Sequence, residues 1–465
     1  MLKKNEQITL SIEDLSNEGL GIGHAQGMAV FVKDAVIGDT VLAGIVKEKK
    51  TCAFARTLEI ITPSPDQVQA PCPVARACGG CQLQMLSYPA QLAFKQNKVR
   101  SDLIRLGGLD KETLPMDPVI GMEEPWRYRN KAQFPIGTKK ADGEGGPKPA
   151  AGFYAGRTHS LIETQDCLLG IRENEAILKT VLSHMEKYRI LPYNEKDGTG
   201  LVRHVMTRYG AATGQIMTVL VLNGEKLPGE NELSRQLMEI PGMVSVMVNV
   251  NREKTNVILG KTLRVLRGKE YLEDDIGPVR FRISPLSFYQ VNPRMTRVLY
   301  EKVLEFAHLT GSETVWDLYC GIGTISLFLA RHAKRVFGVE VVPEAIRDAR
   351  GNARRNGIEN ADFFVGRAEQ ILPEKYEKEG IFADVCVIDP PRKGCGREVI
   401  ETLLHMAPAR IVYVSCDSGT LARDLRVFCE GGYQVRRVQV VDQFAMTVRV
   451  EVVVLLEREE REITC

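Results

Sequence analysis

The chain has 465 residues, of which 44% are hydrophobic and 26% charged, and its formal net charge at pH 7 is +2. These values are ordinary for a soluble protein, and the length predicts two to four domains. The near-neutral balance excludes a chain that is basic throughout, although a local basic patch is compatible with it. The longest aliphatic run, 452–456, is far too short to cross a bilayer, so we expect no membrane partner.

The use of cysteine also narrows the class of protein. No apolar stretch follows the charged first residues, which predicts that there is no signal peptide and that the protein is cytoplasmic. In that compartment the eleven cysteines are expected to bind metal or take part in catalysis rather than to form disulfides. Nothing in the pattern requires a partner chain, so we expect a monomer.

Short apolar segments alternate with glycine turns over residues 5–61. Segments 7–12, 29–32 and 40–46 read as strands, and the turns contain Gly19, Gly21, Gly23, Gly27 and Gly38. Short strands with regular turn signals predict a small β-barrel, a fold that often binds oligonucleotides. A generic β module fits the same pattern.

A proline-rich breaker at 63–73 marks a linker, and a cysteine cluster overlaps its end. Cys72, Cys78 and Cys81 are soft ligands that need a fourth, for which Cys167 is the nearest candidate and Cys52 the other upstream option. Four thiolates hold either zinc or an iron–sulfur cluster, and the spacing does not decide between them. The plain alternative is a set of cysteines without a ligand.

A helix is expected over 88–105, followed by a mixed α+β region at 127–275 with a loop rich in glycine, lysine and proline at 138–149. Between Trp126 and Arg157 there are seven basic residues and two acidic ones. Five aromatic residues are interleaved with them, namely Trp126, Tyr128, Phe134, Phe153 and Tyr154. Basic and aromatic residues together suit RNA backbone contacts and base stacking. The alternative is a solvated surface with ordinary core aromatics.

After Ser284 the predicted elements alternate between helix and strand. Helices are expected at 293–308, 323–332, 343–356 and 397–406, and strands at 313–319, 335–341, 361–365, 383–389 and 410–415. This alternation predicts a doubly wound, Rossmann-like α/β domain with a parallel sheet. Residues 435–458 read as a closing pair of strands. The predicted domains are therefore 1–62, 63–283 and 284–465, and helix 88–105 is a candidate to pack on the last.

The segment from Asp317 to Gly323, D-x-x-C-G-x-G, is a strand end, a glycine turn and a helix start. Gly321 and Gly323 allow the backbone to approach a ligand, and Glu340 near the end of the next strand is placed to accept ribose hydroxyls. The set resembles a class I S-adenosylmethionine methyltransferase. A glycine turn that merely packs is the alternative.

Asp389 ends another strand, in the sequence D-P-P-R, where its carboxylate can hold a target base. Amino-methyltransferases of nucleic acids carry an aromatic residue after a similar turn. Arg392 stands at that position, which argues against methylation of adenine N6.

Cys416 follows an apolar strand, where a thiolate could act as nucleophile. Carbon 5 of uracil becomes reactive once a thiolate adds to carbon 6, and a base must then remove the carbon-5 proton. Glu451, an acid inside the apolar closing strand, is the candidate base, because burial would raise its pKa. The alternatives are an inert buried cysteine and an exposed glutamate.

The chain resembles the RNA uracil-5-methyltransferase family in four segments, namely 288–292, 317–323, 389–392 and 415–424. The resemblance implies that Gln290, Tyr319, Glu340 and Asp389 contact cofactor or base, that Cys416 is the nucleophile and that Glu451 is the base. The family usually reads His-Val-Glu-Thr around the base, whereas this chain reads Arg-Val-Glu-Val at 449–452.

The amino-terminal module resembles a TRAM domain, a small RNA-binding barrel. The subfamily with such a cysteine set carries a [4Fe–4S] cluster, which the resemblance assigns to Cys72, Cys78, Cys81 and Cys167. The expected activity is S-adenosylmethionine-dependent methylation of 23S ribosomal RNA, because the transfer-RNA branch generally lacks barrel and cluster. The alternatives are transfer-RNA uracil-5 methylation and a non-catalytic RNA-binding or assembly factor.

Overall fold

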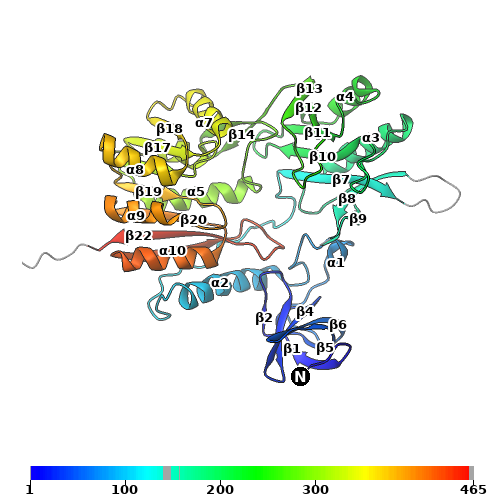
Figure 1. The fold of residues 1–465 in the computed structure, drawn as a ribbon, viewed down its shortest axis with the longest axis horizontal. Coiled ribbons are helices and arrows are strands. Elements are labelled where there is room, and N and C mark those ends of the chain that lie inside the picture. Colours follow the sequence, from blue (N-terminus) through cyan, green and yellow to red (C-terminus); the bar gives the residue numbers. More distant parts are fainter. Residues whose placement is uncertain (1, 140–147, 157, 460–465) are drawn as a thin grey trace, which may run out of the picture.

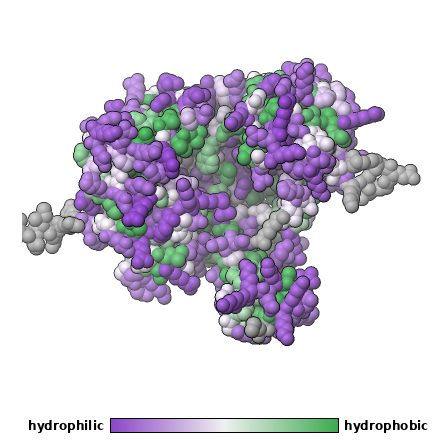
Figure 2. All heavy atoms as spheres, in the orientation of Figure 1, coloured by the Kyte–Doolittle hydropathy of each residue, from purple (hydrophilic) through white to green (hydrophobic). Residues whose placement is uncertain are grey.

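The computed structural model describes residues 2–139, 148–156 and 158–459, which fold into a small barrel beside two larger lobes (Figure 1). The loop expected at 138–149 falls mostly outside these residues. None of the described helices is long and apolar enough to cross a membrane. The face shown in Figure 2 is mostly hydrophilic, with hydrophobic residues between the two large lobes among those that it exposes.

The amino-terminal module is a six-stranded sheet in the order β1-β5-β6-β4-β3-β2. Its inward side chains alternate along each strand and form one core, as a half-buried strand requires. A Cβ at Gly23 would lie 2.3 Å from the Ser11 carbonyl oxygen, so glycine allows β3 to pass close to β1 and close the barrel. The expected barrel is confirmed. Its strands are β1 Gln7–Ser11, β2 Asp14–Leu15, β3 Gly21–Ala25, β4 Met28–Lys33, β5 Thr40–Glu48 and β6 Cys52–Thr62.

The central lobe contains a seven-stranded sheet in the order β13-β12-β11-β10-β7-β8-β9. Helices α3 and α4 cover one face, and Met206 and Met217 on the other face join the core of the carboxy-terminal lobe. The elements are α1 Ala75–Cys78, α2 Tyr88–Arg105, β7 Lys131–Lys139, β8 Lys148–Tyr154, β9 Leu161–Glu163, α3 Glu173–Lys187, β10 Val202–Tyr209, β11 Ile216–Leu222, α4 Glu230–Met238, β12 Met243–Val250 and β13 Thr262–Gly268.

The carboxy-terminal lobe is the expected Rossmann-like domain, with the sheet order β18-β17-β16-β19-β20-β22-β21. Its first five strands are parallel, and β22 runs antiparallel between β20 and β21. The elements are β14 Leu272–Ile276, β15 Val279–Ile283, α5 Pro293–Ala307, β16 Thr314–Leu318, α6 Thr324–Ala330, β17 Arg335–Glu340, α7 Pro343–Arg355, β18 Ala361–Val365, α8 Ala368–Glu379, β19 Val385–Ile388, α9 Arg397–Met406, β20 Arg410–Ser415, α10 Ser418–Glu430, β21 Tyr433–Val441 and β22 Glu451–Arg458.

Two faces of this sheet are covered by different helices. Side chains of α5, α6 and α7 form the core on one face together with the β14–β15 hairpin. Side chains of α8, α9 and α10 cover the other face, where Val99 and Leu103 of α2 join them. Helix α2 therefore belongs to the catalytic core by packing, and so does the hairpin at 272–283. The domain division at residue 284 stays a prediction.

Candidate active site

The turn between β16 and α6 adopts a conformation that favours glycine. Tyr319, Gly321 and Gly323 have positive φ angles of 68°, 56° and 79°. At Gly323 a Cβ would also lie 3.1 Å from Ala349 and from the ring of Phe363, whereas no atom lies within 4 Å of a Cβ at Gly321. The backbone at Gly321 is therefore open to a ligand, while Gly323 packs α6 against its neighbours.

Glu340 is tied to this turn. It is the last residue of β17, and its Oε2 accepts a hydrogen bond from the Gly321 backbone nitrogen at 3.3 Å. Its Oε1 accepts from the Val342 backbone nitrogen at 3.0 Å. The carboxylate therefore lies directly beside the glycine turn, in the arrangement that receives the ribose of a nucleoside cofactor.

Gln290 lies on the segment that enters α5. Its carbonyl oxygen accepts a hydrogen bond from Asn130 Nδ2 at 2.8 Å, which joins this segment to the central lobe. Two residues earlier, the Phe288 side chain is 71% exposed. The hydrogen bonds found for Gln290 in the described chain do not join it to the glycine turn. Its predicted contact with cofactor or base therefore rests on the sequence.

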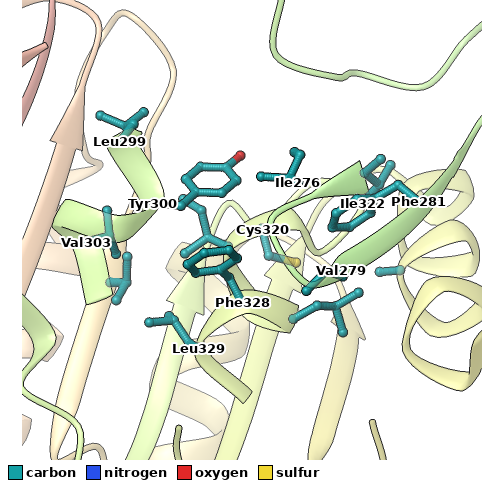
Figure 3. Close-up of a cluster of buried hydrophobic side chains, with 14 of the residues drawn as sticks. Ile276, Val279, Phe281, Leu299, Tyr300, Val303, Cys320, Ile322, Phe328 and Leu329 are labelled. Atoms are coloured by element: carbon teal, nitrogen blue, oxygen red, sulfur yellow. The ribbon is translucent and has the colours of Figure 1, made fainter. Parts of the chain in front are cut away.

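The sequence did not single out Tyr300, although this residue lies between the glycine turn and the carboxylates that are predicted to be catalytic. Its hydroxyl donates to Thr324 Oγ1 at 2.8 Å, at the first turn of α6. Figure 3 shows its ring above that of Phe328, with Cys320 beside them, within a cluster of buried hydrophobic side chains. Burial raises its pKa, and the charges of Asp389, Asp317 and Glu451 raise it further. All three carboxylates therefore lie near one buried phenol.

Asp317 is a further site residue whose role the motif did not specify. Its side chain is fully buried, and Ser326 Oγ donates to Oδ2, while Oδ1 has no partner among the described residues. Burial raises the pKa of Asp317 to about 7, and the charges of Asp389 and Glu340 add to this effect. A carboxyl with such a pKa inside a cofactor turn is typical of a functional site.

The three predicted catalytic residues converge because of the strand order. Asp389 and Cys416 follow the parallel neighbours β19 and β20, so both lie at the same edge of the sheet. Strand β22 runs antiparallel to β20, with Val452 opposite Ser415. Glu451, the first residue of β22, therefore lies beside the end of β20. Asp389, 27 positions before Cys416, and Glu451, 35 positions after it, therefore lie with Cys416 at the same edge of the sheet.

Electrostatics confirms that these groups are neighbours. Burial raises the pKa of Cys416 to about 11, and negative charge on Glu451 and Asp389 contributes. Burial also raises the pKa of Asp389 to about 7. Glu451 is only 4% exposed, and its pKa is well above the usual range because of burial and the charge of Asp389. The site thus holds a thiol beside two carboxyls, and burial raises the pKa of all three groups.

Arg392 supplies the positive charge of this site. It lowers the pKa of both Cys416 and Glu451, although its side chain is exposed. In the sequence analysis this residue served only to argue against methylation of adenine. Its position directly after the D-P-P turn could have indicated that it lies at the site. Arg449, the departure from the family pattern, is exposed, and its backbone nitrogen donates to Thr447 Oγ1 at 3.3 Å.

The four predicted cluster ligands line one pocket. Cys72, Cys78, Cys81 and Cys167 surround it together with Gln84 and apolar side chains, whereas Cys52 lies in β6 of the barrel. Burial raises the pKa of Cys78, and raises that of Cys81 to about 11, with added repulsion among the cysteine thiolates. No three His, Cys, Asp or Glu side chains of the described chain form a tight site for a single metal ion.

The basic and aromatic stretch at 126–157 is partly buried among its described residues. Tyr128 and Phe134 are buried core residues, as the alternative of ordinary core aromatics expects. Arg127 is bonded through both terminal nitrogens to Asp166. In β7 the consecutive residues Phe134, Pro135 and Ile136 are all buried, so simple alternation in the sequence would not have identified the inward positions.

Comparisons with known proteins agree with this geometry. Residues 249–459 match the family model described as tRNA (uracil-5-)-methyltransferase, and residues 2–58 match the TRAM domain. A relative from Halalkalibacterium halodurans, named as an RNA methyltransferase, is 50% identical over 457 residues, which cover 98% of each chain. A relative from Clostridium tetani with the same kind of name is 49% identical over 456 residues, which cover 98% of this chain and 97% of the relative.

A solved structure extends the similarity to the whole architecture. The Pyrococcus abyssi tRNA (uracil-54, C5)-methyltransferase, in complex with S-adenosyl-L-homocysteine, matches with a TM-score of 0.76 and 25% identity. The match covers 97% of this chain and all of that one. The fold and site thus define an S-adenosylmethionine-dependent RNA methyltransferase. The chain belongs to the RNA uracil-5-methyltransferase family and begins with a TRAM domain.

Proposed function

We propose that this protein methylates carbon 5 of a specific uridine in 23S ribosomal RNA, with Cys416 as nucleophile and Glu451 as base. The observation that carries the proposal is the convergence of Cys416, Glu451 and Asp389 at one sheet edge, each with a raised pKa. Such a group of perturbed residues beside a cofactor turn is typical of catalytic sites.

The proposed reaction uses each residue at a stated atom. Asp389 accepts or donates a hydrogen bond at the edge of the flipped uracil, and so orients the ring. The Cys416 thiolate adds to carbon 6, which forms an S–C bond and leaves an enolate whose carbon 5 is nucleophilic. S-adenosylmethionine, when bound, supplies the methyl group. Glu451 then takes the carbon-5 proton, the S–C6 bond breaks, and the thiolate leaves with its electron pair.

The described residues suit S-adenosylmethionine. The open backbone at Gly321 beside the Glu340 carboxylate suits the nucleoside part, and Tyr319 and Gly323 shape the same turn. The Tyr319 hydroxyl is buried, and its side chain lies near Glu369 and the Gly396 backbone. Gln290 and Asp389 complete the proposed set of cofactor and base contacts.

The four-cysteine pocket supports a [4Fe–4S] cluster held by Cys72, Cys78, Cys81 and Cys167. Repulsion among the thiolates would be relieved by bound cations. The four thiolates would hold such a cluster and would supply its ligands, while no three His, Cys, Asp or Glu side chains of the described residues form a site for a single metal ion. We propose a structural role, in which the cluster joins 72–81 to the region around Cys167.

The ribosomal target is supported by the combination of a TRAM barrel with the four-cysteine pocket. Transfer RNA is the second candidate substrate, because the P. abyssi enzyme with the same architecture acts on tRNA. The barrel, residues 1–62, and the central region, residues 63–283, are proposed to bind RNA.

Incubation of the purified protein with labelled S-adenosylmethionine separates these substrates. We expect 5-methyluridine in undermethylated 23S RNA, located by mass spectrometry of nuclease fragments, and none with Cys416→Ala. Methylation of unmodified tRNA alone would transfer the proposal to the second candidate. Tight RNA binding without any methylation would indicate a non-catalytic factor.

A further inference from the structure

Helix α2 carries a stripe of polar residues on its buried face. Tyr88, Gln91, Lys95, Lys98 and Asp102 are spaced by three and four positions, so they lie along one side of the helix. Gln91 and Lys95 are almost completely buried, at 1% and 0% exposure. Buried polar side chains are costly unless they are hydrogen-bonded, so their partners show what this face of the helix holds.

The amino-terminal part of the stripe holds the segment that precedes Glu451. Tyr88 Oη donates to Asp442 Oδ2 at 2.9 Å, and Lys95 Nζ donates to Asp442 Oδ1 at 2.5 Å and to the Phe444 carbonyl at 3.0 Å. Both members of the Lys95–Asp442 ion pair are fully buried. The start of the 442–450 connection between β21 and β22 is thus fixed by a charge pair from outside the sheet.

Two further side chains fix the middle of the same connection. Gln91 Oε1 accepts a hydrogen bond from the Met446 backbone nitrogen at 3.0 Å. Tyr128 Oη, from the central lobe, donates to the Ala445 carbonyl at 3.0 Å. The backbone five and six residues before Glu451 is therefore bonded to side chains that lie more than 300 residues earlier in the chain.

The carboxy-terminal part of the stripe holds the residue after the nucleophile turn. Lys98 Nζ donates to Ser418 Oγ at 3.0 Å, and Ser418 Oγ donates to Asp102 Oδ2 at 2.5 Å. Ser418 is the first residue of α10 and lies two positions after Cys416. Helices α2 and α10 lie side by side over this region (Figure 1).

We infer that α2 is a positioning element for the active site, with one part of its polar stripe placing Glu451 and the other placing Cys416. The inference rests on the proposed function, because it assigns α2 to the same two catalytic groups. None of the five stripe residues is assigned a contact with the uracil. They are positioning residues that act through the connection at 442–450 and through Ser418.

Each part of the stripe affects a different chemical step. A displaced Glu451 slows removal of the carbon-5 proton and leaves addition of Cys416 intact, so the covalent protein–RNA intermediate accumulates. A displaced Cys416 slows the addition itself, so less intermediate forms. A purely structural role of α2 would instead lower stability and affect both steps alike.

The test for the base uses Tyr88→Phe and Tyr128→Phe, each of which removes one hydroxyl and leaves no charge unpaired. Tyr433→Phe is the matched control, because its buried hydroxyl donates to the Pro408 carbonyl at 2.7 Å at a distant position in β21. The amount of adduct during turnover is read on denaturing gels with labelled 23S fragment and S-adenosylmethionine. We expect about tenfold more adduct than wild type for the two tyrosine variants, since small displacements of a catalytic group cost about that much or more. Tyr433→Phe should lower Tm similarly without adduct accumulation.

The test for the nucleophile uses Asp102→Asn in a Glu451→Gln background, where elimination is blocked and adduct formation is observed alone. Asp102→Asn should slow adduct formation about tenfold, whereas Tyr128→Phe in the same background should leave the rate unchanged. Equal behaviour of all variants and the Tyr433→Phe control would overturn the inference. If Glu451→Gln itself yields no adduct, the assignment of the base fails, and the positioning role falls with it.

Discussion

Arg392→Gln tests whether the exposed arginine activates Cys416, the proposed nucleophile. Cys416 has a pKa of about 11, so at pH 8 about 0.1% of it is thiolate, against about 10% for a thiol with a pKa of 9. Arg392 lowers this pKa, and its loss must raise it further. A charge contact near the surface is worth on the order of 1 kcal/mol, so the thiolate fraction should fall about three- to tenfold at any pH below 11.

The assay is the rate of alkylation of Cys416 by iodoacetamide, followed by peptide mass spectrometry between pH 7 and 10. The rate should rise about tenfold per pH unit in both proteins, because alkylation requires the thiolate and the raised pKa lies above this range. Since Arg392 is exposed, the difference from wild type should shrink in 0.5 M salt.

Arg426→Gln is the matched control, since Arg426 is 64% exposed on α10 and pairs with Glu430 rather than with the site. An Arg392→Gln protein that alkylates as fast as wild type would refute the assigned role of this charge. If Arg392→Gln and Arg426→Gln lowered the alkylation rate equally, the effect would come from the net charge of the protein and not from the position of Arg392.

Three further predictions concern the supports of the site. Lys95→Met should lower the free energy of unfolding in urea by about 3–5 kcal/mol, because it leaves the buried Asp442 carboxylate without its cation. The double variant Lys95→Met with Asp442→Leu should recover most of this loss. No recovery would show that the loss does not come from the unpaired carboxylate. Glu340→Gln should weaken S-adenosylmethionine binding about tenfold by calorimetry with unchanged RNA affinity, and equal affinity for the cofactor would argue against the ribose contact. Cys167→Ser should lower the iron and sulfide of anaerobically purified protein severalfold while Cys52→Ser does not, and zinc in place of iron would reject the cluster.

The sequence predicted the Rossmann-like domain well because its strands are short and apolar and its helices periodic. It missed α8, where Pro373 lies inside the helix, and α10, although Asp417 is a recognisable N-cap that accepts from Thr420. Both helices follow strands of the parallel sheet, where the alternation itself indicated a crossover.

The convergence of the site was predictable only in part. Parallel strands place Asp389 and Cys416 at one edge, but the position of β22 between β20 and β21 could not be read from local pattern. Tyr300 looks like an ordinary core residue in the sequence, and Asp317 appears there only as the first residue of the D-x-x-C-G-x-G motif, because the burial of both side chains depends on residues far away in the chain. The polar residues of the α2 stripe have helical spacing in the sequence. Without knowledge of their partners, such spacing predicts a helix face exposed to solvent.

The most direct measurement of the central claim is the fate of uridine RNA on Glu451→Gln enzyme with S-adenosylmethionine. A protein–RNA band that survives denaturing electrophoresis, carries one methyl group and joins carbon 6 of uridine to the peptide with Cys416 is the predicted result. The band should be absent from Glu451→Gln with Cys416→Ala. Full turnover by Cys416→Ala, or an adduct on another residue, would contradict covalent catalysis by this thiol.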